Sequence, residues 1–497
     1  MHYTSTRDAH VDVTSSQAIA RGISRDGGLY LPKTLPALSL WEIKSLADMD
    51  YAGRAEHVLS KFLTAEGGWT RDELRGHVQG AYTGTFSNPA VAPLVDIAGA
   101  EDMHILELFH GPTCAFKDLA LQLLPRLLVA SAAKTMGKDK EILILTATSG
   151  DTGKAALEGF KDVPGIKIIV FYPSEGVSAM QKRQMLSQEG SNVRVVGVLG
   201  NFDDAQNGVK AIFANDNIGV VLAARGRYLS SANSINWGRL APQIVYYISA
   251  YCDLLRAGKI TAGEGINFVV PTGNFGNILA AYYAKRLGLP IKKLICASNK
   301  NRVLTDFFES GIYNRNRPFH TTSSPSMDIL ISSNLERLLY LAARRDAEQC
   351  AGWMRQLNTD GRYAVPPELL RSLQTEFAAG SCDEAQCAAA IQHTWTKNGY
   401  LSDTHTAVAL HVLEDYRART GDRTRSVVVA TASPYKFAGS VLEAIGEAAP
   451  ANEFDALEAL QAATGTPCPA PLRGLREKPL RFSEVCLPAR MAEYTRW

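Results

Sequence analysis

The sequence predicts an α/β protein with parallel sheets that helices cover on both faces. From about residue 140 onward, apolar segments of strand length alternate with helical segments, which is the pattern of βαβ units. The strand segments are apolar along their whole length, as expected of strands buried on both faces of a sheet. The chain of 497 residues, 46% of them hydrophobic, is long enough for two or three domains with a large core.

Composition and charge exclude several classes of protein. The net charge of +2 gives no reason to expect a nucleic acid or a membrane surface as a partner, and no apolar run approaches the roughly 20 residues of a membrane span. The N-terminus is polar and lacks the apolar core of a signal peptide. The eight cysteines form no CxxC pair and the ten histidines no metal-binding pattern. We therefore expect free thiols, a cytoplasmic protein and no metal site.

The N-terminal region covers residues 1–95. Residues 15–22 have the pattern of a short helix, and Asp26-Gly27-Gly28 that of a turn into a short strand ending at Pro32. No residue pattern in this region points to chemistry, so we expect a packing domain without a catalytic role.

The rest of the chain is expected to form two α/β domains. The smaller domain covers 139–234, and the larger one combines 96–138 with 235–497, including a helical insertion at 335–398 and a tail from about 450. Strands are expected at 104–109, 142–145, 166–172, 193–199, 267–271, 293–297 and 426–430. Helices are expected at 119–124, 154–160, 178–188, 205–213, 237–255 and 275–287.

One stretch, His110 to Asp118, joins a predicted strand to a predicted helix and reads His-Gly-Pro-Thr-Cys-Ala-Phe-Lys-Asp. Lys117 therefore lies at a helix start, where the helix dipole disfavours a charged ammonium. Phe116 supplies an apolar neighbour, and Asp118 is placed to cap the helix. Burial lowers a lysine pKa and makes the neutral amine available as a nucleophile and a proton carrier. The alternative is an ordinary surface lysine at a helix start.

Two further loops lead from a strand into a helix and present backbone N–H groups there. They are residues 149–153 and 271–277. Such N–H groups suit a carboxylate or a phosphate, although a plain helix cap explains the first loop equally well. The second loop has glycines at 273 and 276, but its spacing matches neither the dinucleotide fingerprint nor the P-loop.

The stretch around Lys117 closely resembles the cofactor-lysine motif of the threonine synthase family, which belongs to the fold type II enzymes that depend on pyridoxal phosphate (PLP). The resemblance extends to residues 3–32, 146–153, 178–183, 233–239, 271–277 and 403–434. It implies two parallel-sheet α/β domains, the larger one binding PLP, plus a small N-terminal domain. The cofactor contacts that it implies are Lys117, Phe116, Asp151, Gly273, Asn274, Phe275, Gly276, Asn277 and Thr431. The substrate contacts that it implies are Ser149, Gly150, Asp151, Thr152, Ser178, Gln181, Asn236 and Arg239.

The resemblance also implies particular roles. Asp151 stands where many relatives have an asparagine that faces the 3′ oxygen of the cofactor, and Thr431 is the neutral partner of the pyridine nitrogen unless it only caps the helix before Pro434. Asn236 and Arg239 are three residues apart, so we expect them on one helical face, with Arg239 offering forked donors to a substrate phosphate. Beside Ser178 and Gln181, Lys182 and Arg183 are either similar donors or a solvated helix face.

The activity implied by the resemblance is the PLP-dependent conversion of O-phospho-L-homoserine and water to L-threonine and phosphate, the last step of threonine biosynthesis. Lys117 would be the catalytic residue of this lyase. Two alternatives stay open: another fold type II lyase, such as a serine/threonine dehydratase, and a non-catalytic PLP-binding protein. We expect a monomer or a homodimer and no regulation by S-adenosylmethionine.

Overall fold

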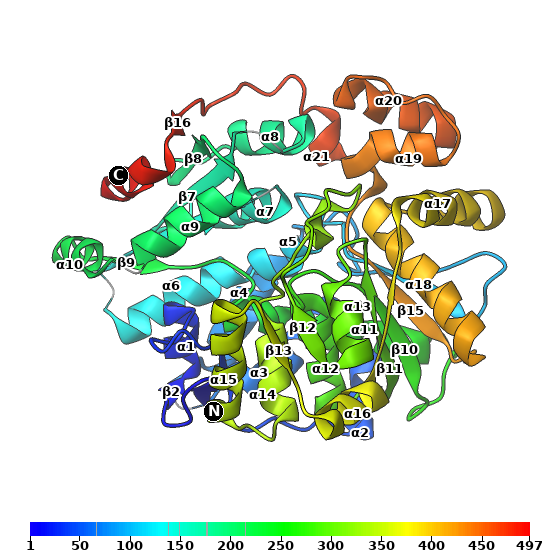
Figure 1. The fold of residues 1–497 in the computed structure, drawn as a ribbon, viewed down its shortest axis with the longest axis horizontal. Helices are drawn as coiled ribbons and strands as arrows, with labels where there is room; N and C mark the ends of the chain where they lie inside the picture. Colours follow the sequence, from blue (N-terminus) through cyan, green and yellow to red (C-terminus); the bar gives the residue numbers. More distant parts are fainter. Residues whose placement is uncertain (66, 138, 149, 175–176, 214) are drawn as a thin grey trace.

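Two sheets of mostly parallel strands organise the molecule. The structure is a computed structural model that describes residues 1–65, 67–137, 139–148, 150–174, 177–213 and 215–497. Helix α5 (Lys117–Leu121) lies near the middle of the molecule, with the smaller sheet on one side and the larger sheet on the other (Figure 1). The predicted α/β class with parallel sheets is therefore confirmed.

The larger sheet has six strands in the order β14-β11-β10-β15-β5-β4. Neighbouring strands are parallel except for the edge pair β4 and β5, which is antiparallel. The central strands β10 and β15 are buried along their whole length, because apolar side chains point from both faces into packed helices. The strands are β4 (Leu94–Asp96), β5 (Met103–Glu107), β10 (Ile266–Pro271), β11 (Ile291–Ser298), β14 (Phe377–Ser381) and β15 (Ser426–Ala430).

The smaller sheet has five parallel strands in the order β16-β8-β7-β6-β9. Its first four strands in the sequence come from the predicted smaller domain, but the edge strand β16 comes from the C-terminal tail. The strands are β6 (Glu141–Ala147), β7 (Ile166–Pro173), β8 (Val193–Val198), β9 (Arg227–Ser230) and β16 (Val485–Cys486).

The N-terminal region forms a small antiparallel sheet and four helices. Three of the four helices start with a reciprocal cap between a Thr or Ser hydroxyl and a Gln or Glu three residues on, which fixes where they begin. The buried guanidinium of Arg54 pairs with Asp253 at 2.8 Å and so ties this region to helix α11. The elements are β1 (His2–Ser5), β2 (Val13–Thr14), β3 (Tyr30–Pro32), α1 (Ser15–Arg21), α2 (Leu40–Ala47), α3 (Tyr51–Leu63) and α4 (Arg71–Tyr82).

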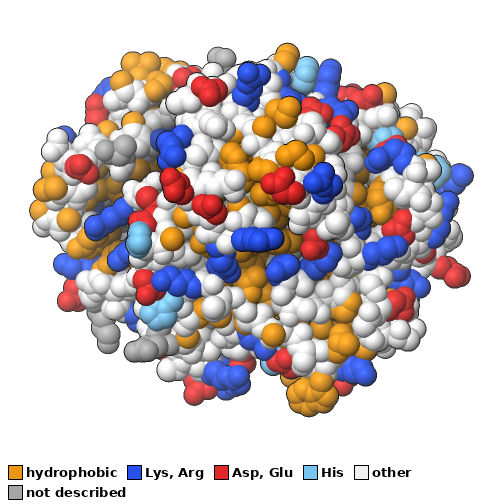
Figure 2. All heavy atoms as spheres, turned by 60° about the horizontal axis from the view of Figure 1, so that its bottom comes forward, with side chains coloured by type: hydrophobic (Ala, Val, Ile, Leu, Met, Phe, Trp, Pro, Cys, Tyr) orange, Lys and Arg blue, Asp and Glu red, His pale blue; other side chains and the backbone are white. Residues whose placement is uncertain are grey.

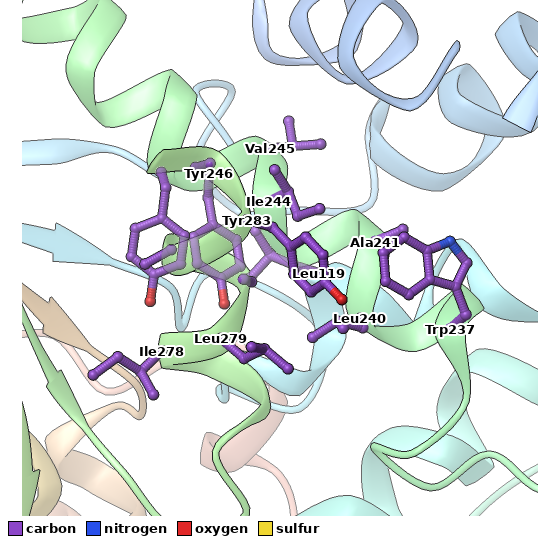
Figure 3. Packing of buried hydrophobic residues seen from close by; sticks show 14 of the residues in the cluster. Leu119, Trp237, Leu240, Ala241, Ile244, Val245, Tyr246, Ile278, Leu279 and Tyr283 are labelled. Atoms are coloured by element: carbon purple, nitrogen blue, oxygen red, sulfur yellow. The ribbon is translucent and has the colours of Figure 1, made fainter. Parts of the chain in front are cut away.

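Helix α11 (Trp237–Arg256) is the central helix of the core. It packs against α12, α5 and the N-terminal helices α2 and α3, so it is buried nearly all round. Figure 3 shows the contact: Trp237 and Leu240 of α11 lie close to Leu119 of α5 and to Tyr283 of α12. The ring centroids of Trp237 and Tyr283 are 5.3 Å apart in an edge-to-face arrangement.

The remaining helices cover the two sheets and form the C-terminal part. Helix α6 packs against α1 and α11, helices α7 to α10 belong to the segment around the smaller sheet, and those from α12 onward belong to the segment around the larger sheet and the tail. They are α6 (Leu124–Thr135), α7 (Asp151–Phe160), α8 (Ala179–Leu186), α9 (Phe202–Phe213), α10 (Asp216–Ala224), α12 (Gly276–Leu287), α13 (Val303–Ser310), α14 (Leu335–Ala342), α15 (Ala347–Thr359), α16 (Pro367–Glu376), α17 (Glu384–Asn398), α18 (Thr404–Thr420), α19 (Ala438–Ala444), α20 (Glu453–Thr464) and α21 (Ala470–Arg473), with short 3₁₀ helices η1 (Pro325–Met327), η2 (Pro434–Phe437) and η3 (Pro488–Arg496).

The predicted strands and helices are present, with three differences. The insertion 335–398 is not only helical, because β14 joins the larger sheet beside β11 and a short strand β13 (Arg362–Ala364) pairs with β12 (Ile312–Asn314). The tail does more than cover the surface, because β16 extends the smaller sheet. The predicted helix 119–124 is two helices, α5 and α6, separated at Gln122 and Leu123.

The visible surface carries charges of both signs. Figure 2 shows Lys and Arg side chains interspersed with Asp and Glu over this face, with scattered apolar side chains between them. Among the described residues, no helix is long and apolar enough to span a membrane.

Candidate active site

Lys117 lies at the first position of α5, beside the end of strand β15. The chain leaves β5 at Glu107, and the backbone N–H of Phe116 then donates to the carbonyl of Thr431 at 2.8 Å. Ala115 forms an isolated bridge with Ala432. These contacts bring the predicted Lys117 and Thr431 together at the same edge of the larger sheet, where ligands bind in open α/β sheets.

Asp118 braces the loop before Lys117 and does not cap the helix, contrary to the sequence prediction. Its two carboxylate oxygens accept from the backbone N–H and the hydroxyl of Thr113, at 2.8 and 2.7 Å. A Cβ on Gly111 would lie 2.4 Å from this side chain, so the loop requires glycine there. Burial raises the pKa of Asp118 to about 6, against the opposing effect of the hydrogen bonds from Thr113.

The Lys117 ammonium is buried among few polar neighbours. Its Nζ lies 3.4 Å from the hydroxyl of Ser326, 3.6 Å from Oδ2 of Asp151 and 5.1 Å from the ring centroid of Phe116. Burial lowers the pKa of Lys117 to about 8, and the charge of Asp151 opposes this while those of Lys436 and Arg239 add to it. About a fifth of the amine is therefore neutral at pH 7.4 and about half at pH 8, and the neutral amine is the form that nucleophilic chemistry requires.

Asp151 is held by a residue that the sequence interpretation missed, Lys436 of η2. Lys436 Nζ lies 2.6 Å from Asp151 Oδ1, and the amide of Gln181 donates to the same oxygen at 3.1 Å. Burial alone would raise the pKa of Asp151, but Lys436 and Lys117 outweigh it and hold this pKa well below its usual range. Nothing local marks Lys436 among the 52 lysines and arginines of the chain, since only the fold brings η2 next to α7.

Glycine at position 150 allows this arrangement. A Cβ there would lie 2.4 Å from the amide carbon of Gln181, and the backbone has a φ of 153°. Thr152 follows at the second residue of α7, where the N–H groups of a helix start have no intrahelical acceptor. Gly150, Asp151 and Thr152 are thus adjacent to the Lys117 site, whereas Ser149, predicted in the same loop, lies outside the described residues.

The loop between β10 and α12 supplies a second set of helix-start N–H groups. Its carbonyls are occupied: Asn334 donates to the carbonyl of Asn274 and Ser332 to that of Gly273. Phe275 takes a left-handed conformation with φ of 63°, which turns the chain sharply into the helix. The N–H groups of residues 276–278 have no acceptor within the helix and are available to an anion.

The two glycines of this loop differ in their surroundings. A Cβ on Gly273 would lie 2.7 Å from the backbone carbonyl of Ser326, so the close approach of η1 requires glycine. A Cβ on Gly276 would make only ordinary contacts, the nearest at 3.5 Å to Asn334. The Asn277 side chain, predicted to bind the cofactor, instead accepts from the hydroxyls of Tyr246 and Tyr247 through Oδ1, so that oxygen faces the core.

Arg239 of α11 is a buried cation without an acidic partner among the described residues. Its Nη1 donates to the carbonyl of Ala232 at 2.9 Å, while Nε has no hydrogen-bond partner there. Burial lowers the pKa of Arg239 to about 10, so the guanidinium stays charged at neutral pH. Its charge also lowers the pKa of Lys117, so the two buried cations influence each other.

Asn236 and Ser178, both predicted to contact the substrate, make hydrogen bonds within the protein. The Asn236 amide donates to the carbonyls of Ile19 and Ser231 and its oxygen accepts from the N–H of Gly238, so Asn236 does not share the site-facing side of α11 with Arg239. The hydroxyl of Ser178 caps α8 by accepting from the N–H of Gln181. The Asn236 amide is thus engaged on both its nitrogen and its oxygen, whereas the Ser178 hydroxyl donates to no group among the described residues. Contact of either side chain with a substrate stays a prediction.

Arg183 also points away from the site. Its guanidinium donates to the carbonyls of Leu475 and Lys478 in the tail. The sequence had left open whether this residue binds phosphate or lies on a solvated face, and the structure shows a third role, which is to anchor the tail.

A further polar group near Lys117 comes from residues 403–405. Asp403 accepts from Nδ1 of His405 at 2.8 Å, and His405 Nε2 accepts from the backbone N–H of Ser326 at 3.2 Å. This fixes the tautomer of the histidine and the position of Ser326 beside Lys117. Residues 403–434 were part of the resemblance, but the contact of His405 with Ser326 of η1 could not be derived from the sequence.

Comparison with known proteins gives first the class and then the family. Residues 91–432 match the family described as pyridoxal-phosphate dependent enzyme, a segment that contains Lys117 and most strands of both sheets. Residues 2–82 match the family described as threonine synthase N terminus, and residues 406–490 the one described as threonine synthase, C-terminal.

Individual relatives agree with this class. The chain is 37% identical to the threonine synthase of Pseudomonas aeruginosa over 94% of this chain and 96% of that protein. A crystal structure of PLP-bound threonine synthase from Brucella melitensis superimposes with a TM-score of 0.87 at 39% identity, covering 100% of this chain and 99% of that one. The chain belongs to the threonine synthase family of PLP-dependent enzymes.

Longer relatives also exist. The chain is 43% identical to threonine synthase-like 1 of Macaca fascicularis over 86% of its own length, but this match spans only 58% of that protein.

Proposed function

We propose that this protein is a PLP-dependent lyase that converts O-phospho-L-homoserine and water to L-threonine and phosphate. The observation that carries the proposal is a pair of buried cations whose charges influence each other, Lys117 with its lowered pKa and Arg239, which has no acidic partner among the described residues. A family member that acts on a phosphorylated substrate needs an anion site besides the one for the cofactor phosphate. An uncompensated buried guanidinium is costly, and an anionic substrate would relieve that cost.

The residues of the site fit PLP. The helix-start N–H groups of α12 would hold the cofactor phosphate, aided by the close turn at Gly273 and the sharp turn at Phe275. Lys117 would hold the cofactor covalently, with Phe116 beside it. Thr431, at the end of β15, would offer a neutral hydroxyl to the pyridine nitrogen, and Asp151 would face the 3′ oxygen.

In the proposed reaction, the cofactor and the residues of the chain have different tasks. When bound, PLP supplies the electron sink that stabilises negative charge on the substrate carbons. Lys117, with its lowered pKa, takes the proton from Cα and later returns one. Loss of a proton from Cβ would accompany the departure of phosphate from Cγ, and Arg239 would hold that phosphate. Cγ would then gain a proton, and water would add its hydroxyl at Cβ while its remaining proton goes to the released phosphate. Gly150, Asp151, Thr152 and Gln181 would hold the substrate carboxylate side of the site.

One comparison of products tests the function. Purified protein loaded with PLP is supplied with O-phospho-L-homoserine, and released phosphate and threonine are measured. In parallel, the same preparation is supplied with L-threonine, and ammonia is measured. We expect equal amounts of phosphate and threonine in the first assay and little ammonia in the second. Ammonia release without phosphate release would favour a dehydratase, and no turnover with PLP still bound would favour a non-catalytic binding protein.

We also infer three broader properties. The eight cysteines are all free and buried, which supports a reducing, cytoplasmic location. The mixed surface charge in Figure 2 supports a small-molecule substrate over a nucleic acid, with a monomer or homodimer as the working unit. The domain division at 1–95, 139–234 and the remaining segments is supported by the sheets that these segments form, apart from two edge strands: β4 begins at Leu94 and joins the larger sheet, and β16 of the tail joins the smaller one.

A further inference from the structure

The ion pair between Lys436 and Asp151 is the most buried one at the site. The side chain of Lys436 is 0% exposed and that of Asp151 2%. Lys436 Nζ also donates to the carbonyl of Thr113 at 3.1 Å, in the loop that leads to Lys117. One ammonium therefore connects three segments, namely η2, the start of α7 and the loop before α5.

This ion pair fixes which oxygen of Asp151 faces Lys117. Oδ1 receives both the Lys436 ammonium at 2.6 Å and the Gln181 amide at 3.1 Å. Oδ2 lies 3.6 Å from Lys117 Nζ, which is within ion-pair distance but longer than a charge-assisted hydrogen bond. The carboxylate is thus oriented by Lys436 and Gln181, and its second oxygen is directed at the reactive amine.

The charges around Lys117 decide whether its amine is reactive. The groups that face it are Asp151 of α7, Lys436 of η2, Arg239 of α11 and the neutral hydroxyl of Ser326, while His405 of α18 acts on Asp151. A lone buried carboxylate at this distance would strongly favour the protonated ammonium of Lys117. The Lys436 charge cancels that of the carboxylate, so burial and Arg239 keep the amine partly neutral.

We propose that Lys436 is a positioning residue that orients Asp151 toward Lys117 and cancels its charge, so that Lys117 keeps a reactive neutral amine near physiological pH. The proposal rests on the proposed function only in taking Lys117 as the reactive lysine. Without this role, Lys436 would only add the free-energy cost of removing a charge from water.

The test measures the pH dependence of Lys117 reactivity in the full-length chain after removal of PLP. Acylation of Lys117 by an amine reagent is followed by mass spectrometry of the peptide that contains it, with circular dichroism as the check of folding. For Lys436→Met we expect the pKa of Lys117 to rise by one unit or more. At pH 8 this lowers its labelling rate about fivefold, because the neutral fraction falls from about one half to about one tenth.

A second substitution separates electrostatics from structure. In the double variant Lys436→Met/Asp151→Asn, the carboxylate charge is gone as well, so we expect the labelling rate to return to within about twofold of the original. Lys436→Gln keeps a hydrogen-bond donor without the charge and should behave as Lys436→Met, and it replaces that variant if Lys436→Met fails to fold. Lys436→Arg keeps the charge and should retain the original pH profile.

Two outcomes would overturn the proposal: an unchanged Lys117 pH profile in a folded Lys436→Gln or Lys436→Met variant, or a double variant as impaired as the single one. Neither outcome depends on the substrate. Phosphate release by the unmodified protein tests the proposed function separately, so that either idea can fail alone.

Discussion

Replacement of Arg239 by methionine should separate ligand recognition from stability. Burial lowers the pKa of Arg239 from 12.5 to about 10, and at 1.36 kcal/mol for each pKa unit this is a cost of about 3 kcal/mol for keeping the charge buried at neutral pH. Arg239→Met removes that cost and also loses the hydrogen bond to the carbonyl of Ala232, which contributes about 1 kcal/mol. Without ligands, the variant should therefore be more stable by about 2 kcal/mol.

The same substitution should lower catalytic efficiency, although it raises stability. A charge-assisted contact to the substrate phosphate is worth about 2–3 kcal/mol, so kcat/KM for O-phospho-L-homoserine should fall roughly 30- to 150-fold in Arg239→Met. If the contact tightens as phosphate leaves, kcat should fall in addition to the rise in KM. The assays are phosphate release under substrate saturation and below it, and urea unfolding of the protein without ligand.

Arg183→Met is the matched control for this substitution. Arg183 donates to tail carbonyls, so its loss should lower stability and leave kcat/KM nearly unchanged, the reverse of the pattern for Arg239. The reasoning is refuted if Arg239→Met is less stable than the original protein while kcat/KM is unchanged, because Arg239 would then be a structural residue. Loss of PLP from Arg239→Met would show that this guanidinium holds the cofactor instead.

Three further predictions concern the cofactor and the lysine. Lys117→Ala should abolish both turnover and the borohydride-fixed attachment of PLP, seen as a mass increase on the peptide that contains residue 117, while circular dichroism stays unchanged; normal threonine formation by this variant would contradict the assignment. Gly273→Ala should destabilise the chain even without PLP, because its Cβ would lie 2.7 Å from a backbone carbonyl, as urea unfolding would show. Gly276→Ala should leave that stability unchanged and weaken only PLP binding; unchanged PLP affinity of Gly276→Ala would place the phosphate elsewhere. Between pH 8 and 10.5 the unfolded chain binds a proton at Lys117 that the folded chain without PLP has lost, so the free energy of unfolding should rise with pH across this window. In urea titrations, Lys117→Met should lack this increase.

The local sequence was enough to predict most helices and strands and the two loops that lead into α7 and α12. Apolar runs such as 142–145 and 426–430 are stable as strands only when both faces are buried, so they predicted strands β6 and β15 correctly. Lys117 was placed at a helix start because a strand pattern precedes it and an apolar helix pattern follows it. Such assignments depend on neighbours within about ten residues, which the sequence displays directly.

Short strands and side-chain directions were decided only by the tertiary structure. Strand β16 is two residues long and exists because the tail reaches the edge of β8, a pairing that no local pattern specifies. Helical spacing put Asn236 and Arg239 on one face, but Asn236 is the cap of α11 and turns toward Ile19, while Arg239, three residues later, donates to the carbonyl of Ala232. A cap residue has a non-helical backbone, so the helical spacing rule does not hold for it.

The chemistry of the site was divided in the same way. The sequence by itself was enough to predict Lys117 as the reactive lysine, because its motif is continuous in the chain. The charge balance around that lysine was decided by the fold, since Asp151, Arg239 and Lys436 are separated by many residues and meet only when α7, α11 and η2 pack around α5. Electrostatic interactions depend on distance and burial in three dimensions, and neither quantity is encoded in the spacing of residues along the chain.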